Sequence, residues 1–331
     1  MLDIRSISEL ASRCHTTSHE LTYLSSHVDR FVRHLELYDP SKPEKPPRPV
    51  ISTFGPLRRI QNCLLREVLL PRIRPSVFNH GGVSGRDIKS NALAHADSVY
   101  GWKTDLSRFF PSIHQWRVYR LFSETLGCEE RVAGILTRLC TYDYHLPLGL
   151  PTSPLLADQI AKGLDRRIAG LAMQHGLVYT RFVDDLTLSG AFSFDLKYCR
   201  LPRLIERIIS ECGFSMAAQK TCEGRLRDAN FVITKLRLHI GRLDVAADYV
   251  LEVERQIADH HDLACDKHFV GPLLTRDMLR SRIAFVISIR PSRRLGLLRR
   301  FGSINWAKVA DHAKEKGLLL VRKKLRPVGV C

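Results

Sequence analysis

LVYTRFVDDLTLSG, residues 177–190, predicts a β-hairpin whose turn carries Asp184 and Asp185. Aromatic and β-branched residues on both sides of the turn favour strands. Adjacent aspartates between apolar strands are unusual, because each charge must be solvated or bound. At a hairpin tip both carboxylates can project toward one spot. For an isolated Asp-Asp pair, a turn without a ligand is the commoner alternative, since Asp is a frequent turn residue.

A third aspartate, Asp105, ends the strand-like run YGWKTD at residues 100–105. A carboxylate on a strand beside the hairpin would complete a site for a hard cation, because Mg²⁺ prefers oxygen ligands and shares its site with substrate phosphates. Two such ions about 4 Å apart can activate an attacking hydroxyl group and stabilise a leaving pyrophosphate. The three aspartates are therefore candidate metal ligands.

The rest of the chain predicts helices at both ends and strands in the middle, which is typical of an α+β protein. Apolar spacing of three and four residues predicts helices, and short alternating runs predict strands. Helices are expected over most of residues 1–40, over 57–70, 115–140, 155–175 and 201–212, and from about 247 onward, with short strands between 230 and 245.

The composition favours a nucleic-acid partner. Lys and Arg total 51 against 34 Asp and Glu, which gives a formal net charge of +17. A chain this basic usually meets a polyanion: nucleic acid is the first candidate, an anionic membrane surface the second, and a merely basic enzyme the alternative. The nine cysteines include no C-x-x-C pair, so we expect free thiols in the cytoplasm. Neither a membrane span nor a signal peptide is predicted.

Four blocks in the middle of the chain resemble the motifs of reverse transcriptases, in that family's order. They are DLSRFFPSI at 105–113, LPLGLPTSP at 146–154, RFVDDLTLS at 181–189 and CGFSMAAQKT at 212–221. One such block is weak evidence, but four in order are strong. The resemblance implies an RNA-directed DNA polymerase, a nucleotidyltransferase with a right-hand fold of fingers, palm and thumb. Its palm would be an antiparallel sheet and its thumb helical.

The resemblance also implies roles for the charged residues of these blocks. Asp105, Asp184 and Asp185 would hold two Mg²⁺ ions as cofactors. The backbone carbonyl of Leu106 would add a ligand. Lys220, in the last block, would protonate the leaving pyrophosphate.

Other residues match positions that contact the incoming nucleotide (dNTP) or the template. Phe110 would lie under the sugar and exclude a 2′-hydroxyl group. Arg48 would contact the triphosphate, with a solvated loop arginine as the alternative. Gly149 permits close backbone approach. Thr152 and Ser153 belong to the same block and could also cap the helix that follows.

Two features resemble the retron enzymes within this family. NALAH at residues 91–95 matches an Asn-Ala-x-x-His motif placed just before the first block, and we expect Asn91 to begin a helix there. Residues 48–61 resemble the retron fingers region. The alternative for the motif is structural: Asn91 would cap the helix and His95 would be a hydrogen-bonded histidine.

The chain departs from the family pattern at three places. Leu148 stands where Gln is usual, which affects the expected template contact. Phe182 stands where Tyr is usual and lacks only its hydroxyl group. Residues 233–235, Ile-Thr-Lys, stand where retron enzymes often carry Val-Thr-Gly, which is thought to help recognise their RNA. A divergent RNA partner would account for this last departure.

We expect three parts: an N-terminal helical extension at 1–45, fingers and palm at 46–245, and a basic helical thumb at 246–331. Basic residues of the thumb would grip a duplex through its phosphates, with a solvated charged face as the alternative. They are Arg276, Arg280, Arg282, Arg290, Arg293, Arg294, Arg299, Arg300, Lys323, Lys324 and Arg326.

The retron resemblance implies a dedicated structured noncoding RNA as template. DNA synthesis would start from a 2′-hydroxyl group within it and leave a branched RNA–DNA product (msDNA). Retron systems are similar to anti-phage defence modules, so the expected partners are this RNA, its DNA product, dNTPs and a separate effector protein. Two alternatives stay open: a non-retron reverse transcriptase, such as a group II intron enzyme or another defence polymerase, and a non-catalytic RNA-binding scaffold.

Overall fold

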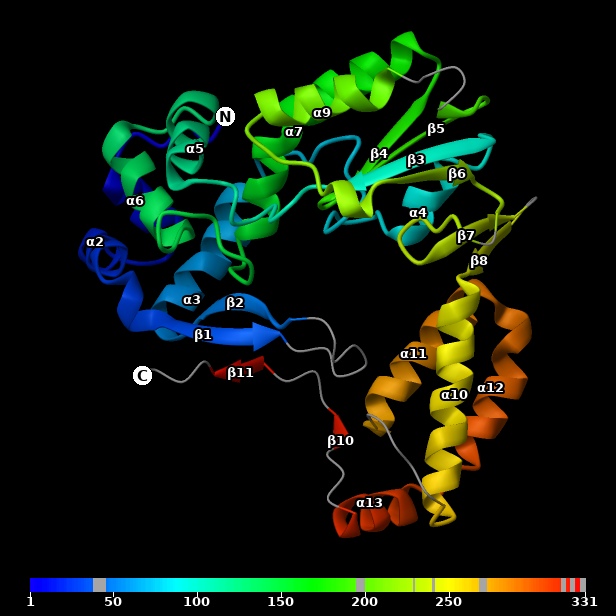
Figure 1. The fold of residues 1–331 in the computed structure, drawn as a ribbon. Coiled ribbons are helices and arrows are strands. Elements are labelled where there is room, and N and C mark those ends of the chain that lie inside the picture. The colour runs from blue at the N-terminus through cyan, green and yellow to red at the C-terminus, as the bar shows by residue number, and fades with distance from the viewer. Residues whose placement is uncertain are drawn as a thin grey trace. The chain divides into compact units, whose positions relative to one another are not determined.

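The computed structural model describes residues 1–37, 46–194, 200–228, 230–239, 242–267, 273–316, 320–321 and 325–327. They divide into two compact units, each with its own hydrophobic core. The first unit is built from Met1–Leu35 and Pro49–Arg225, and the second mainly from Leu226–Arg326 (Figure 1).

A four-stranded antiparallel sheet in the order β4-β5-β3-β6 lies at the centre of the first unit. Its strands are β3 (Tyr100–Asp105), β4 (Val178–Phe182), β5 (Asp185–Gly190) and β6 (Cys222–Arg225). β4 and β5 form the predicted hairpin. β5 pairs with β3 so that Asp105 lies directly opposite Asp185. The prediction of an α+β protein with an antiparallel central sheet is confirmed.

Helices cover both faces of this sheet. α7 (Ser153–Gln174) and α9 (Leu201–Glu211) lie over one face, and α4 (Ile88–Leu93) packs against the other (Figure 1). Leu186 and Leu188 of β5 are fully buried in the same core as α7. α7 and α9 match the helices predicted from apolar spacing.

The N-terminal helices share the core of the sheet-bearing unit. One continuous cluster of buried residues joins Leu10 and Leu24 to Leu136 and Leu188. The helices are α1 (Ile7–Arg13), α2 (Ser18–Ser26), α3 (Gly55–Cys63), α5 (Gln115–Arg120) and α6 (Glu130–Cys140). Single π-helical turns follow α3 and α5 over Leu64–Leu69 and Leu121–Thr125, and 3₁₀ turns cover Val28–Phe31 and Ala218–Lys220.

The helix predicted across residues 1–40 does not extend so far. Val32–Leu37 instead forms strand β1, which lies beside β2 (Arg48–Thr53) in a sheet. Apolar spacing in this stretch fits both states, and the partner strand decides between them. The expectation of a helix here is therefore wrong, because this stretch pairs with the strand that follows it in the chain.

The single helix predicted across residues 115–140 is also wrong. The chain leaves the helical path at Leu126 and resumes it at Glu130. Gly127 takes a φ of +72°, which no right-handed helix contains. Glycine adopts this conformation at little cost, so it ends one helix and lets α6 start in a new direction.

The second unit begins with the hairpin β7 (Leu236–His239) and β8 (Arg242–Val245), as predicted, and continues as helices. The helices are α10 (Ala247–Ala264), α11 (Arg276–Ile289), α12 (Arg294–Gly302) and α13 (Trp306–Glu315). A 3₁₀ turn covers Pro291–Arg293, and short strands are β9 (Leu273–Leu274), β10 (Leu320–Val321) and β11 (Leu325–Pro327). Among the described residues, no helix has the length and apolar character needed to cross a membrane.

The C-terminal arginines fall into two groups. Arg282, Arg290 and Arg293 form ion pairs with acidic residues of the second unit. The exposed group on α11 and α12 consists of Arg276, Arg280, Arg294, Arg299 and Arg300. Lys323, Lys324 and the side chain of Arg326 lie outside the described residues. The exposed arginines therefore present the positive surface of these two helices.

Candidate metal site and active centre

Three aspartates meet where β3 ends and β5 begins. Asp105 is the last residue of β3, Asp185 is the first of β5, and Asp184 lies in the turn before it. Each offers a carboxylate oxygen, and these oxygens all lie within 4.8 Å of one another. Asp105 is buried, Asp184 half-buried and Asp185 exposed, so the group opens to solvent on one side. We call these three residues the aspartate cluster.

The aspartate cluster carries a concentrated negative charge. Partial desolvation and the neighbouring carboxylates of Asp184 and Asp105 raise the pKa of Asp185 to about 6, although Lys220 acts in the opposite direction. Like charges held this close favour binding of a proton or a cation. Because hard cations such as Mg²⁺ prefer carboxylate oxygens, the three residues fit a divalent cation site.

Lys220 reaches the aspartate cluster from the end of its 3₁₀ turn. Its Nζ donates to Asp105 Oδ1 at 2.7 Å, and its side chain is about half exposed. The amide of Ala217 donates to the Asp105 carbonyl oxygen at 2.8 Å, which fixes this turn against the end of β3. The structure thus brings the predicted proton donor and one predicted metal ligand into a direct ion pair.

Two further predicted residues follow Asp105 in the chain. The Leu106 amide donates to the Asp184 carbonyl oxygen at 2.9 Å and so ties the end of β3 to the hairpin turn. Phe110 is half-buried against the core, with its ring centroid 5.4 Å from that of Phe109. The metal contact of Leu106 and the sugar contact of Phe110 stay predictions.

Val183, which precedes Asp184 in the turn, has an unusual backbone. Its φ is +61°, and only Val183 and Asp184 separate the paired ends of β4 and β5. A two-residue turn with positive φ at its first position favours glycine, and a β-branched residue is strained there. Such strain costs about 1–3 kcal/mol and persists only where the surroundings impose it.

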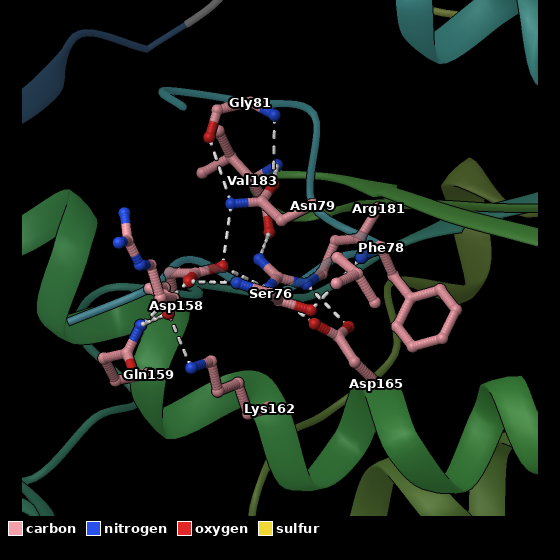
Figure 2. A network of polar contacts seen from close by, with 12 residues as sticks. Ser76, Phe78, Asn79, Gly81, Asp158, Gln159, Lys162, Asp165, Arg181 and Val183 are labelled. Carbon is pink, nitrogen blue, oxygen red and sulfur yellow. Dashed lines mark hydrogen bonds and ion pairs between the residues drawn. The ribbon is translucent and has the colours of Figure 1, made fainter. Parts of the chain in front are cut away.

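A buried ion-pair network lies beside this turn (Figure 2). Arg181 of β4 is 1% exposed and donates to both oxygens of Asp165 and to Asp158 Oδ1, each at 2.8 Å. Burial would lower the pKa of Arg181, but hydrogen bonds to Asp165 and the charges of both carboxylates outweigh it and raise the pKa. The Arg181 network, as we call it, consists of Asn79, Asp158, Asp165, Tyr179 and Arg181.

The sequence reading missed the Arg181 network. Asp158 and Asp165 stand seven residues apart on the buried face of α7, and both are almost inaccessible to solvent. A carboxylate on an apolar helix face is costly unless it is paired, so this placement is a usable signal. The spacing of the two aspartates along α7 does not identify their cationic partner, because Arg181 lies on a separate element, strand β4.

Gly149 is required by the close approach of β2. Its φ is +117°, and a Cβ atom there would lie 2.5 Å from the Ile51 carbonyl oxygen and 2.6 Å from Val50 Cγ1. The Ile51 amide donates to the Leu148 carbonyl oxygen at 2.9 Å, which holds the loop against this strand. Arg48 is exposed at the start of β2. The substrate contacts of Gly149 and Arg48 stay predictions.

Thr152 and Ser153 stand at the start of α7, and both are fully buried. Thr152 occupies the N-cap position, but its side chain makes no capping hydrogen bond, so the expected cap is wrong. Buried hydroxyl groups cannot reach a bound template without rearrangement. The half-buried residues at 148–149 of the same block are more accessible to a template or nucleotide than Thr152 and Ser153.

The Asn-Ala-x-x-His motif has a structural role here. Asp87, and not Asn91, caps α4, and Asn91 is buried inside the helix. His95 is fully buried and hydrogen-bonds Ser189 Oγ at 2.7 Å and Thr180 Oγ1 at 2.8 Å. Burial lowers the pKa of His95 to about 3, so its ring is neutral. The histidine thereby fastens the end of α4 to both strands of the hairpin.

Residues 233–236 form a tight turn in the second unit. Thr234 and Lys235 have φ values of +46° and +72°. Ile233 and Leu236 exchange backbone hydrogen bonds of 2.8 and 2.9 Å. A two-residue turn with two positive φ values favours Asn-Gly, so a glycine in place of Lys235 would keep the turn with less strain.

The chain is similar in sequence to known reverse transcriptases. No protein-family model matches the chain. The chain is 31% identical to the retron Ec86 reverse transcriptase of Escherichia coli over 251 residues, which cover 75% of this chain and 73% of that protein. It is 36% identical to the retron Mx65 reverse transcriptase of Myxococcus xanthus over 183 residues, covering 50% of this chain and 42% of that protein. A solved telomerase from Candida albicans, in complex with a fragment of telomeric RNA, matches 89% of this chain and 65% of its own at 10% identity, but its TM-score of 0.44 does not establish a shared fold.

Proposed function

The chain belongs to the retron reverse transcriptases, and from this premise we propose that the aspartate cluster binds two Mg²⁺ ions together with the phosphates of an incoming dNTP. The enzyme is an RNA-directed DNA polymerase. The observation that supports the metal role is the convergence of Asp105, Asp184 and Asp185, whose oxygens all lie within 4.8 Å of one another. A scaffold would gain nothing from like charges held so close, since their repulsion opposes the arrangement.

Bound Mg²⁺ would supply the positive charge that activates the primer hydroxyl group and stabilises the leaving pyrophosphate. The protein contributes fixed carboxylates, and catalysis is mostly positioning and charge neutralisation. The backbone carbonyl of Leu106, next to Asp105, is proposed as a further ligand.

Lys220 is proposed to protonate the pyrophosphate. Its ammonium group is held by Asp105, and its side chain is about half exposed. With Asp105 engaged as a metal ligand, Lys220 would be free to turn its ammonium group toward a phosphate. Lys220 is well suited to this task because it combines a charge with a proton that it can release.

Substrate contacts are also proposed for Phe110, Arg48 and the loop that contains Gly149, according to how accessible each one is. Phe110 would lie under the sugar of the nucleotide, where the core behind it keeps the ring in place. Arg48 is exposed and can reach a triphosphate. In the loop that contains Gly149, backbone groups rather than the buried hydroxyls of Thr152 and Ser153 would meet the template or base.

We assign residues 1–45 to an N-terminal helical extension, 46–245 to fingers and palm, and 246–331 to a thumb. The thumb would hold an RNA–DNA duplex through the exposed arginines of α11 and α12. Such contacts go to phosphates and read the shape of the duplex rather than its sequence.

The proposed template is a dedicated structured noncoding RNA, copied from a 2′-hydroxyl group within it into a branched RNA–DNA (msDNA). The proposed setting is a cytoplasmic anti-phage retron system with a separate effector protein. Because the turn at 233–236 carries Lys235 where retron enzymes often have glycine, we expect the RNA to be recognised by a somewhat different set of contacts.

Protein expressed with its native upstream DNA tests this proposal. Co-purifying nucleic acid is digested with DNase, RNase and a debranching enzyme, with the Asp184→Ala/Asp185→Ala variant as control. We expect a branched RNA–DNA that is absent from the variant. Unbranched DNA, lost in the variant, would overturn the branched product but keep the polymerase. RNA alone, identical in both proteins, would overturn the catalytic role and favour an RNA-binding scaffold.

A further inference from the structure

The Arg181 network contacts Val183, the residue that precedes Asp184 of the aspartate cluster, and Figure 2 shows Val183 beside Asn79 and Arg181. Arg181 Nη1 donates to the Val183 carbonyl oxygen at 2.9 Å. The Val183 amide donates to Asn79 Oδ1 at 3.2 Å. Both backbone polar groups of this strained residue are therefore fixed by side chains that lie outside the turn, and the next residue is Asp184.

Asn79 is itself held firmly. Its Nδ2 donates to Asp158 Oδ1 at 2.8 Å and to the Gly81 carbonyl oxygen at 3.1 Å, and its side chain is buried. Asp158 Oδ1 also accepts from Arg181. One carboxylate oxygen on α7 thus fixes both side chains that grip Val183.

The loop that carries Asn79 closes over Val183. The His80 amide donates to the Arg181 carbonyl oxygen at 2.7 Å, and the Arg181 amide donates to the Phe78 carbonyl oxygen at 2.8 Å, so the loop pairs with β4. A Cβ atom on Gly81 would lie 2.5 Å from Val183 Cγ2 and 2.7 Å from Val183 N. The loop therefore leaves Val183 little room to relax.

We propose that the Arg181 network is a positioning device for the metal ligands. It keeps Val183 in the left-handed conformation, and in a two-residue turn that conformation sets the direction of Asp184 and Asp185. The inference rests on the proposed metal role of these aspartates. Asn79, Asp158 and Arg181 are positioning residues, because they act on the metal ligands through Val183.

Stability alone does not account for this arrangement. A buried ion pair is often no more stabilising than apolar residues of similar volume. A glycine at the position of Val183 would remove the strain without any network. Strained backbone held by surrounding contacts is found where side chains must keep a fixed direction, as metal ligands must.

Asn79→Ala tests the inference with the least disturbance. It removes the hydrogen bond to the Val183 amide, together with those to Asp158 and Gly81, and leaves the ion pairs of Arg181 in place. We expect the purified variant to bind Mn²⁺, used as a probe of the site, about 10-fold more weakly than the wild type, as is usual when a partner of a metal ligand is lost. Electron paramagnetic resonance measures free Mn²⁺ directly. DNA synthesis should need correspondingly more Mg²⁺, with little change in KM for the dNTP.

A second substitution separates positioning from folding. In Asn79→Ala/Val183→Gly the glycine adopts positive φ without help, so Mn²⁺ affinity should return close to the wild-type value. Glycine adds no contact, and therefore it would not repair a loss of stability. Gln159→Ala is the matched control, because Gln159 donates to Asp158 Oδ2 at 3.2 Å but does not touch the turn. Its Mn²⁺ affinity should be unchanged.

Unchanged Mn²⁺ affinity in Asn79→Ala, or no recovery in the double variant, would overturn the positioning role. If Asn79→Ala does not fold, Gly81→Ala alone replaces it, since its methyl group would displace Val183 while keeping every side chain that bonds the turn, and unchanged Mn²⁺ affinity in this variant would likewise overturn the positioning role. Asp185→Asn identifies a failure of the proposed function. Mn²⁺ binding equal to that of the wild type in this variant would overturn the metal site and the positioning role together, whereas the other outcomes concern positioning alone.

Discussion

The aspartate cluster and the Arg181 network are two acidic groups in one unit, and they differ in what balances their charge. In the network the carboxylates bond a buried guanidinium at 2.8 Å, and no part of the group is open to solvent. In the cluster three carboxylates lie together, and Lys220, half exposed, pairs with Asp105. In the network one buried guanidinium bonds two carboxylates, whereas in the cluster one lysine faces three carboxylates and leaves a larger negative charge that an incoming cation can balance.

The largest effect is expected from Asp185→Asn, which takes one charge from the aspartate cluster. DNA synthesis should fall by about 10³-fold, because bound cations stabilise the transition state by several kcal/mol. The folded protein should be unharmed or slightly stabilised, since like-charge repulsion decreases. Primer extension measures the activity, and thermal unfolding measures the stability. Substantial synthesis by this variant would show that the cluster is not the metal site.

Arg181→Met removes the cation of the Arg181 network. Its carboxylates then lie together without a positive partner. We expect the free energy of unfolding to fall by about 3–5 kcal/mol, measured with a chemical denaturant. Asp158→Leu/Asp165→Leu/Arg181→Met should recover part of this loss, because all three buried charges leave together while Asn79 and Tyr179 lose their acceptors. An equal loss in both variants would mean that packing, rather than charge balance, maintains the network.

Lys220→Ala removes the cation beside the aspartate cluster. If the lysine donates a proton, kcat should fall by about 10²-fold, the usual size of a general-acid contribution. Lys220→Arg keeps the charge but does not release a proton readily, so it should remain slow with a KM near that of the wild type. Full activity of Lys220→Arg would show that only the charge matters. Single-turnover kinetics would separate this step from product release.

The smallest expected effect is the change in stability of the metal-free protein with pH. The pKa of Asp185 in the folded protein is about 6, above its ordinary value of 3.8, so between these pH values the folded protein holds more protons than the unfolded chain. Stability should therefore fall as pH rises through this range, by about 1 kcal/mol once solvent screening of this exposed group is allowed for. Denaturant titrations from acid to neutral pH measure the slope. The same slope in Asp185→Asn would contradict the assignment.

The hairpin could be predicted because its signals are local, whereas the meeting of Asp105 with Asp184 and Asp185 was expected from the resemblance to reverse transcriptases, since β3 and β5 are far apart in the chain. Alternating strands surround Asp184 and Asp185, and a short run of strand residues leads to Asp105. The α+β class followed from the same alternation and from helical spacing elsewhere. The roles of Lys220 and Phe110 came instead from the resemblance to reverse transcriptases, since neither residue is marked by spacing.

The parts that could not be predicted depend on packing partners that the local pattern does not reveal. Val32 begins a strand because β2 lies beside it, and nothing near Val32 reveals that pairing. Arg181 is one of many arginines in a basic chain, and only the fold shows that it is buried. The burial of Thr152 likewise depends on neighbours that the local pattern does not contain.

The position of β3 has a consequence for the chain as it is being synthesised. β3 lies between β5 and β6, both of which the ribosome makes later, and the ion pair between Lys220 and Asp105 spans 115 residues. A nascent chain that ends before Asp184 has only one of the three aspartates. We infer that a translation product that stops before Asp185 lacks the complete aspartate cluster and cannot start copying RNA.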